Sequence, residues 1–222
     1  MTKKVLVTDY VWPSVEPERK VLAEADAELV VAPDGSEETL ASLARDVDGI
    51  LTCFAQVTEA VVRAAERCVV IGRYGVGVDN IAVDTATELG IAVTYVPDYC
   101  VEEVSDHVMA LLLAWNRRIV LFDNATKRKG WGSEGLGMRI MRLRGKTLGI
   151  VGLGKVGSEV ARRARAFEMT VIAFDPYVAD ERARGIGVEM VDMDGLLGGS
   201  DYISIHTPLT GGTKSLIGAP EF

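Results

Sequence analysis

A six-residue segment with three glycines, Gly152-Leu-Gly-Lys-Val-Gly157, constrains the fold more than any other part of the sequence. It directly follows an apolar, strand-like run at residues 147–151 and opens a segment of helical periodicity at residues 155–167. In this context Gly152 allows a tight turn, Gly154 lets the backbone approach a pyrophosphate, and Gly157 lets helix and strand pack closely. We therefore predict a parallel α/β sheet with a dinucleotide pyrophosphate at the helix N-terminus. A purely structural strand–helix turn is the alternative.

Asp175 ends the next apolar run, residues 170–174. Its position is close to the offset of ~20 residues expected of the acid that binds the adenosine ribose. A carboxylate here accepts hydrogen bonds from both ribose hydroxyls and repels a 2′-phosphate, which favours NAD over NADP. Arg182 and Arg184 are expected to be solvated surface charges. The structural alternative for Asp175 is a helix cap before Pro176.

Short apolar runs alternate with helical segments from residue 3 to about residue 97. The runs lie at residues 5–7, 29–31, 50–54, 69–71 and 91–96, and the helical segments at residues 16–25, 36–45, 58–66 and 83–89. Short β-branched runs bounded by turns are typical of buried parallel strands. This region is therefore expected to form one doubly wound domain.

A long helix is predicted to begin near Val101, with apolar residues on one face as far as Ile119, and to lead into a second α/β unit. Residues 127–137 are polar and glycine-rich and are expected to form a loop. Beyond Asp175 we expect a short strand, a helical turn and a further strand, at residues 188–191, 194–197 and 202–206. With the chain stopping at Phe222, this amounts to about half of a complete dinucleotide-binding sheet.

Charge and cysteine content narrow the classes of partner. The formal net charge is −8 and the pI is about 4.9, which disfavours nucleic acid. The three cysteines lack metal-site spacing and indicate reduced thiols, so we expect no metal. The sequence shows neither a signal peptide nor an apolar stretch of the ~20 residues that span a bilayer, so we expect a cytoplasmic protein without membrane contact.

Five motifs together resemble the D-isomer-specific 2-hydroxyacid dehydrogenases, in that family's order and spacing. They are Arg73-Tyr-Gly-Val-Gly-Val-Asp-Asn80, Val101-Glu-Glu-Val-Ser-Asp-His107, Gly152 to Gly157, Asp175-Pro176 and His206-Thr-Pro-Leu209. The resemblance covers nearly the whole chain. It implies a flavodoxin-like substrate domain at residues 1–100 and a Rossmann NAD-binding domain at residues 101–222 that is incomplete at its C-terminus.

The resemblance also implies which residues touch the ligands. The loop Gly75-Val76-Gly77 would offer N–H groups to the substrate carboxylate, with Val76 also against the nicotinamide. Consecutive N–H groups in a glycine turn after a strand make an anion-binding nest, although these glycines could also only shape a crossover. Lys155 and Val156 match cofactor contacts at the helix start, and Thr207 matches a contact near the adenosine side.

The family's acid–base histidine, its carboxylate partner and its substrate-clamping arginine would all fall beyond Phe222, so we assign no catalytic residue here. His107 is expected to be a packed core or interdomain residue, and His206 aligns with a non-catalytic position. For Arg73 a structural ion pair is expected rather than substrate contact. These 222 residues alone are expected to have low or no dehydrogenase activity and to expose a hydrophobic sheet edge.

Two functions remain open at this point. One is an NAD-dependent D-2-hydroxyacid dehydrogenase acting on a small 2-hydroxy or 2-oxo acid. The other is an NAD(H)-sensing regulatory protein similar to the C-terminal-binding-protein corepressors of the same superfamily. A third alternative is a non-functional fragment that only retains the fold. Family analogy implies a homodimer in the first two cases, with the Val101 helix as its interface.

Overall fold

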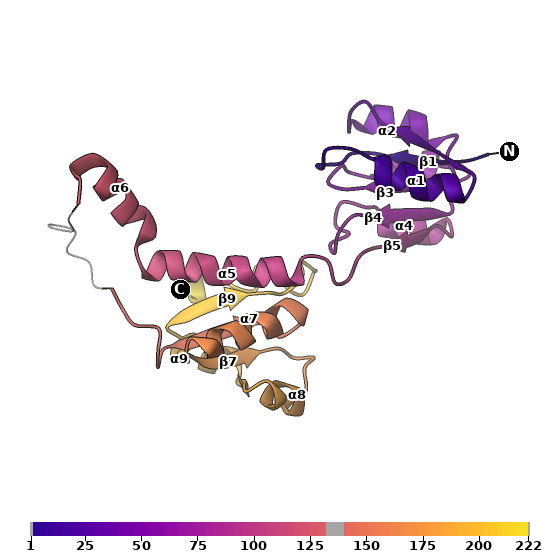
Figure 1. The fold of residues 1–222 in the computed structure, drawn as a ribbon. Helices are drawn as coiled ribbons and strands as arrows, with labels where there is room; N and C mark the ends of the chain where they lie inside the picture. Colours follow the sequence, from indigo (N-terminus) through magenta and orange to yellow (C-terminus); the bar gives the residue numbers. More distant parts are fainter. Residues whose placement is uncertain (1, 132–139, 222) are drawn as a thin grey trace. The chain divides into compact units, whose positions relative to one another are not determined.

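The computed structural model describes residues 2–131 and 140–221, and it divides into two compact units, Met1–Tyr99 and Cys100–Phe222 (Figure 1). Each unit is built on a parallel sheet with helices, which confirms the predicted α/β class. Within the described residues, no helix is both long enough and apolar enough to cross a membrane.

The first unit contains a five-stranded parallel sheet in the order β2-β1-β3-β4-β5. The strands are β1 (Lys3–Val7), β2 (Ala27–Val31), β3 (Gly49–Thr52), β4 (Val70–Arg73) and β5 (Ala92–Thr94). The helices are α1 (Glu16–Glu24), α2 (Glu37–Ala44), α3 (Glu59–Ala64) and α4 (Val83–Glu88). This is the flavodoxin-like order, in which ligands bind outside the carboxyl ends of the strands.

Both faces of this sheet are covered, because neighbouring residues of a strand point to opposite sides. Leu6 of β1 belongs to a large core cluster with Leu40 of α2 and Val61 of α3. Its neighbour Val7 packs in a second cluster with Leu29. The continuous apolar strands predicted from the sequence follow from this two-sided burial.

The second unit contains a four-stranded parallel sheet in the order β8-β7-β6-β9. The strands are β6 (Thr147–Val151), β7 (Thr170–Phe174), β8 (Glu189–Met190) and β9 (Tyr202–Ile205). The helices are α5 (Val101–Asn116), α6 (Ile119–Lys129), α7 (Lys155–Ala166), α8 (Asp180–Gly185) and α9 (Met193–Gly199), followed by a 3₁₀ turn at Ala219–Glu221. The turn between β6 and α7 therefore lies at the carboxyl edge of a central strand.

The helix predicted from Val101 to Ile119 is instead two helices. Arg118 adopts a left-handed conformation with φ of 57°, which interrupts the helix between α5 and α6. Its guanidinium lies 4.3 Å from the centre of the Trp115 ring. The loop expected at residues 127–137 overlaps the end of α6, and residues 132–139 lie outside the described part.

The predicted apolar face of α5 is also only partly buried. Leu111 and Trp115 are 59% and 54% exposed, whereas Ser105 and Asn116 are buried. Both polar side chains donate a hydrogen bond: Ser105 donates to the Val101 carbonyl within the helix, and the Asn116 amide donates to the Tyr202 hydroxyl of β9 at 2.7 Å. Small and hydrogen-bonded side chains thus occupy the inner face, which leaves an apolar stripe outside.

Helix α8 was not predicted from the sequence. It contains Arg182 and Arg184, and Arg184 pairs with Glu181 on the same short helix while its side chain stays 65% exposed. The exposure of the Arg184 side chain confirms that this arginine is a solvated surface charge. The segment was missed because a helix of six residues is too short to show an apolar face by periodicity.

Candidate functional site

The turn between β6 and α7 requires glycine at its first and last positions. Gly152 has a φ of 94°, and a Cβ there would lie 3.0 Å from the carbonyl carbon of His206. A Cβ on Gly157 would lie only 2.2 Å from the carbonyl oxygen of Gly152. The backbone of the helix therefore crosses the turn at a distance that excludes any side chain.

Gly154, unlike Gly152 and Gly157, is not crowded by neighbouring atoms. No atom lies within 4 Å of the position that its Cβ would take, so the space beside it is open. Within the described residues, the N–H groups of Gly154, Val156 and Gly157 donate no hydrogen bond. Unpaired N–H groups at the positive end of α7 beside open space fit the pyrophosphate of a dinucleotide.

Asp175 lies next to this turn, directly after β7. Its Oδ2 accepts a hydrogen bond from the N–H of Leu153 at 2.8 Å, and its Oδ1 accepts one from Tyr177 at 2.9 Å. Each carboxylate oxygen retains a further acceptor position, as ribose hydroxyls require. The helix-cap alternative is wrong, because α8 begins at Asp180 and Ala179 occupies its N-cap position.

The chain after β9 runs along the same turn. The N–H of His206 donates to the Val151 carbonyl at 2.7 Å, and a Cβ on Gly152 would approach the Thr207 methyl carbon to 3.1 Å. Thr207 is thus adjacent to the glycine turn. The His206 ring lies 2.9 Å from the Ser204 hydroxyl, and burial lowers the pKa of its imidazole.

Lys155 and Val156 form the first two positions of α7. Val156 is half-buried and packs against the core beneath the turn, whereas Lys155 is exposed at the helix start. Val156 therefore anchors the start of α7 to the core of the second unit. The second unit brings all the predicted cofactor residues except Val76 to one edge of its sheet.

Val76 belongs to the loop that follows β4 in the first unit. The N–H groups of Gly75, Val76 and Gly77 donate no hydrogen bond within the described part of the chain. The Gly75 carbonyl accepts a hydrogen bond from Val96 at 2.9 Å, and the Val76 side chain is 49% exposed. Three consecutive unpaired N–H groups form the donor set of an anion nest.

Two polar residues hold the neighbouring loop after β3, and neither role was predicted from the sequence. Asp9 accepts hydrogen bonds from the N–H groups of Cys53 at 2.9 Å and Phe54 at 2.7 Å. Burial acts against the charge on Asp9, but the donors from Phe54, Cys53 and the Thr8 hydroxyl prevail and lower its pKa. A carboxylate placed directly after the first strand was the signal that could have found it.

Asn80 ties the two loops together. Its side chain is buried and donates to the Ala55 carbonyl at 2.9 Å. The last residue of the Arg73 to Asn80 motif therefore fixes the glycine loop against the loop after β3. This role follows from the fold and was not apparent from the motif alone.

The expectations of a core position for His107 and of an ion pair for Arg73 are wrong, whereas the interdomain alternative for His107 stays a prediction. His107 is exposed within its unit, because α5 turns Met109 rather than His107 toward the core, so it is no core histidine. No ion pair to Arg73 exists among the residues that the structure describes. Its guanidinium instead lies 5.6 Å from the centre of the Phe54 ring.

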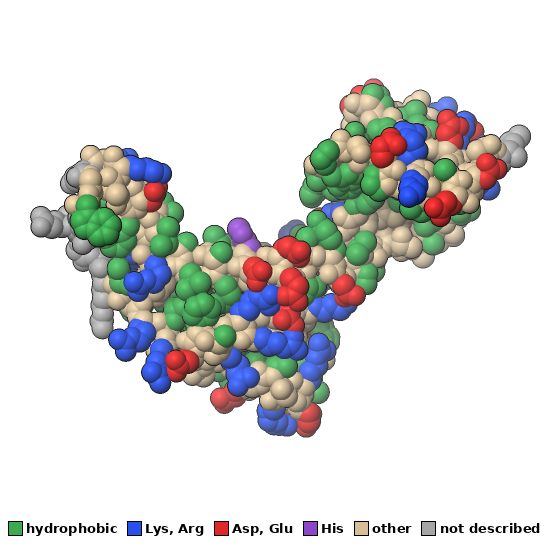
Figure 2. All heavy atoms as spheres, in the orientation of Figure 1, with side chains coloured by type: hydrophobic (Ala, Val, Ile, Leu, Met, Phe, Trp, Pro, Cys, Tyr) green, Lys and Arg blue, Asp and Glu red, His purple; other side chains and the backbone are tan. Residues whose placement is uncertain are grey.

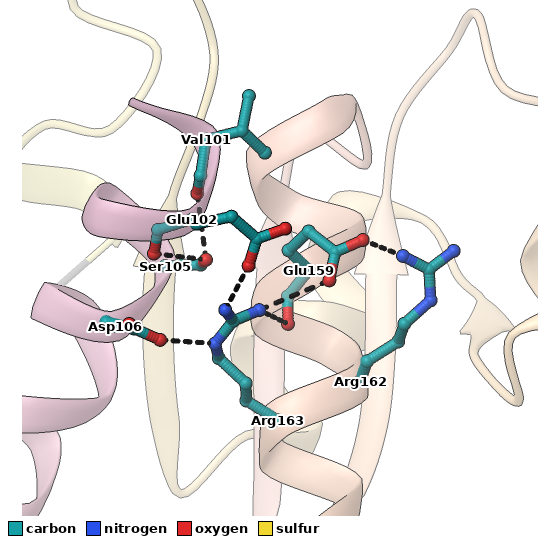
Figure 3. Close-up of polar contacts among 7 residues, drawn as sticks. All are labelled: Val101, Glu102, Ser105, Asp106, Glu159, Arg162 and Arg163. Carbon is teal, nitrogen blue, oxygen red and sulfur yellow. Dashed lines mark hydrogen bonds and ion pairs between the residues drawn. The ribbon is translucent and has the colours of Figure 1, made fainter. Parts of the chain in front are cut away.

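An ion-pair network fixes α7 to α5 (Figure 3). Arg163 binds the carboxylates of Glu102 and Asp106, with 2.7 Å between its Nε and Asp106, and it also contacts Glu159 at 3.2 Å. Hydrogen bonds to Glu102 and Asp106 raise the pKa of the Arg163 guanidinium further. Figure 2 shows the same arrangement on the surface, with acidic side chains along α5 next to basic ones of α7. The helix that carries the glycine turn is thereby held in place.

A family model described as "D-isomer specific 2-hydroxyacid dehydrogenase, NAD binding domain" matches residues 109–222. Among curated proteins, the D-3-phosphoglycerate dehydrogenase of Methanocaldococcus jannaschii is 41% identical over 220 residues, which are 98% of this chain and 41% of that protein. The D-3-phosphoglycerate dehydrogenase of Archaeoglobus fulgidus is 46% identical over 167 residues, which are 75% of this chain and 31% of the relative. The chain thus spans well under half the length of these relatives.

Solved structures are similar in fold over most of the chain. The D-lactate dehydrogenase from Aquifex aeolicus, complexed with NAD and lactic acid, has a TM-score of 0.84 and 27% identity, and the match covers 95% of this chain and 62% of that one. The apo D-lactate dehydrogenase from Escherichia coli has a TM-score of 0.76 and 28% identity, with 97% and 68% covered.

Proposed function

Because this chain belongs to the D-isomer-specific 2-hydroxyacid dehydrogenase family, we propose that it serves NAD-dependent hydride transfer at C2 of a small 2-hydroxy or 2-oxo acid. The observation that carries the proposal is the pairing of Asp175 with the N–H of Leu153, beside a turn that admits only glycine at Gly152 and Gly157. The similar proteins named above are D-3-phosphoglycerate and D-lactate dehydrogenases, which agrees with this reaction class.

We assign the adenosine half of the cofactor to the second unit. Asp175 would bind the ribose hydroxyls, and Gly152, Gly154 and Gly157 would shape the pyrophosphate seat. Lys155 and Val156 would contact the cofactor at the start of α7, and Thr207 would contact it near the adenosine side. When bound, NAD supplies the hydride or accepts it. The charge of Asp175 favours NAD over NADP.

The first unit would bind the substrate. Gly75, Val76 and Gly77 present unpaired N–H groups that can hold a carboxylate, and the exposed side chain of Val76 can pack against the nicotinamide. Asn80 and Asp9 would keep this loop and its neighbour in place. Their contribution is to pre-organise the donors rather than to touch the substrate.

Turnover by this chain alone is proposed to be low. A general acid–base histidine needs a group that orients it. Within the described residues, His206 has a serine hydroxyl as its ring partner and His107 has no hydrogen bond. Neither histidine therefore has the carboxylate partner that this chemistry uses.

We further propose that the protein is a cytoplasmic homodimer that associates through α5. The exposed apolar stripe of α5, with Leu111 and Trp115, supports this choice of interface. Figure 2 shows hydrophobic side chains gathered over α5 and β9. A surface of this kind is typical of an interaction site.

Calorimetric titration of the whole chain with NADH, followed by a 2-oxo acid such as pyruvate, tests the proposal. We expect saturable NADH binding with one site per chain, and little NADH consumption. Absence of NADH binding by a folded chain would remove the basis for the function. Rapid NADH-dependent reduction of any 2-oxo acid would instead overturn the low turnover proposed for the chain alone.

A further inference from the structure

The loops after β1, β3, β4 and β5 are joined by hydrogen bonds at the carboxyl edge of the first sheet. Asp9, after β1, accepts a hydrogen bond from the N–H of Phe54, after β3, at 2.7 Å. The Asn80 side chain, after β4, donates to a carbonyl of the loop after β3 at 2.9 Å. The N–H of Val96, after β5, donates to the Gly75 carbonyl at 2.9 Å. The four loops therefore lie side by side at the edge where ligands of such a sheet bind.

Each of these loops exposes an apolar or aromatic side chain. Phe54 is 64% exposed and Tyr95 is 53% exposed, and Tyr10 and Val76 are exposed as well. Three of the four side chains are rings, which bury a large apolar area on contact with a ligand. Apolar side chains that gather at an exposed edge mark an interaction site.

The same four loops lack positive charge. They contain neither lysine nor arginine over residues 8–14, 53–57, 74–80 and 95–99. They do contain three carboxylates, those of Asp9, Asp79 and Asp98. Among the described strands of this sheet, only β4 ends in a basic residue, which is Arg73. The electrostatic character of the edge is thus set by one cation and three acids.

A phosphorylated substrate would need more positive charge than these loops supply. The similar curated enzymes are named for 3-phosphoglycerate, in which a phosphate of about −1.5 to −2 charges accompanies the carboxylate. Arg19, the first basic residue after the β1 loop, is exposed and binds Glu16 at 3.3 Å. Placing a phosphate among aromatic rings and carboxylates would remove its hydration without supplying a counter-charge.

We propose that this chain takes a 2-hydroxy or 2-oxo acid with an aromatic or other bulky apolar group at C3, and not a phosphorylated acid. The inference rests on the proposed function, in which the loop at residues 75–77 holds the C1 carboxylate. A C3 group then meets the side chains of the adjoining loops, Phe54, Tyr95 and Tyr10 among them. Burial of apolar surface and ring–ring contact both favour such a group.

The test is a titration of the ¹⁵N-labelled whole chain with D-3-phenyllactate, D-lactate and 3-phospho-D-glycerate, followed by the amide resonances of Gly75 and Gly77. The three acids share the carboxylate and the C2 hydroxyl and differ at C3. We expect D-3-phenyllactate to bind about tenfold more tightly than D-lactate, and 3-phospho-D-glycerate to bind more weakly than D-lactate. Benzyl alcohol, which has a ring but no carboxylate, should leave these resonances unchanged.

Substitution of Phe54 tests the contact itself. Phe54→Ala should lower the ratio of the D-3-phenyllactate affinity to the D-lactate affinity about threefold or more, and Phe54→Leu should keep part of the ratio. The ratio is the suitable measure because the Phe54 ring also lies 5.6 Å from the Arg73 guanidinium. Phe167→Ala removes the same kind of ring after α7 in the second unit and should leave the ratio unchanged.

Two results with the wild-type chain would overturn the inference while the proposed function stands. They are equal affinities for D-3-phenyllactate and D-lactate, and tighter binding of 3-phospho-D-glycerate than of D-lactate. A response to benzyl alcohol equal to that with D-3-phenyllactate would also overturn it, since the preference would then be non-specific. No response to any of the three acids would contradict the proposed carboxylate site as well. An unchanged ratio in a folded Phe54→Ala chain counts against the inference, and if that chain unfolds the wild-type comparison decides.

Discussion

The carboxylate of Asp175 accepts a hydrogen bond from the backbone N–H of Leu153, with 2.8 Å between Oδ2 and the nitrogen. This contact joins the end of β7 to the glycine turn after β6. It fixes an acid at the place where the adenosine ribose of a dinucleotide is expected, and it holds the turn itself. The cofactor seat is therefore set by the sheet and not by the turn alone.

Replacing Gly157 by alanine should damage the fold. The new Cβ would meet the Gly152 carbonyl oxygen at 2.2 Å, and that atom belongs to the backbone, so the helix must shift. We expect a loss of ~1–3 kcal/mol in the free energy of unfolding, as for an overpacked core. Urea unfolding followed by circular dichroism measures it.

Gly154→Ala is the matched change at the same turn. No atom lies within 4 Å of the new Cβ, and the φ of −72° suits alanine, so the loss of stability should stay below about 1 kcal/mol. The methyl group would fill the space proposed for the pyrophosphate, so NADH affinity should fall strongly. A Gly154→Ala chain that binds NADH like wild type would show that the pyrophosphate lies elsewhere.

Arg163→Met should loosen α5 from α7. The substitution removes contacts to Glu102, Asp106 and Glu159, but the first two carboxylates are 65% and 70% exposed, which limits the loss to about 1 kcal/mol. The difference from wild type should shrink at high salt, because salt screens exposed charges. Arg184→Met, which loses one exposed pair within α8, is the control and should change stability by less than about 0.5 kcal/mol. Equal effects of both substitutions in urea unfolding would argue against a special role for Arg163.

Asp48 should make the stability of the first unit depend on acid pH. The Lys4 N–H, the Lys3 ammonium and the Arg67 guanidinium bind its carboxylate and lower its pKa from 3.8 to about 2. A depressed pKa means that the stabilisation is complete above the unfolded value of 3.8 and is lost as the pH falls toward 2.

Asp48→Asn should therefore be less stable than wild type at neutral pH, and the gap should close as the pH falls through this window. Urea unfolding at a series of pH values measures the gap. Asp84→Asn replaces an exposed carboxylate on α4 and should give a curve parallel to wild type. A gap for Asp48→Asn that stays constant down to pH 2 would contradict the account.

Self-association should depend on the apolar stripe of α5. Leu111, Trp115 and Ile203 line a groove of about 280 Å³ between α5 and β9. Leu111→Lys places a charge there and should shift the protein toward monomer in sedimentation velocity. Val21→Lys, at an exposed position of α1, is the control. A dimer that survives Leu111→Lys would locate the interface elsewhere.

The fold was largely predictable because the central strands of both sheets are buried on two faces. Strands such as residues 147–151 then read as continuous apolar runs, and the turn after them carries a glycine pattern with a physical cause at each position. The break at Arg118 was not predictable, since a left-handed arginine leaves no trace in helical periodicity. The exposure of the apolar stripe of α5 was not predictable either, because periodicity shows that a helix face is apolar but not which part of the protein covers it.

The site was predictable only in part. The glycines of the turn after β6 and Asp175 could be predicted because their spacing along the sequence is fixed. The roles of Asp9 and Asn80 depend instead on which loops the sheet order brings together. Arg73 shows the same limit. A sequence that holds more acids than bases makes an ion pair the default expectation, and the fold directs those acids to other partners.

The assignment of Asp175 to the adenosine ribose is tested by the affinity of Asp175→Ala for NADH and NADPH, measured by calorimetry on the whole chain. We expect NADH binding to weaken about tenfold or more, through loss of charged hydrogen bonds to the ribose. NADPH binding should change less, so the difference in affinity between the two cofactors should narrow. Asp180→Ala, an exposed acid at the start of α8, should bind both as wild type does. Unchanged affinity of Asp175→Ala for both cofactors would contradict the assignment.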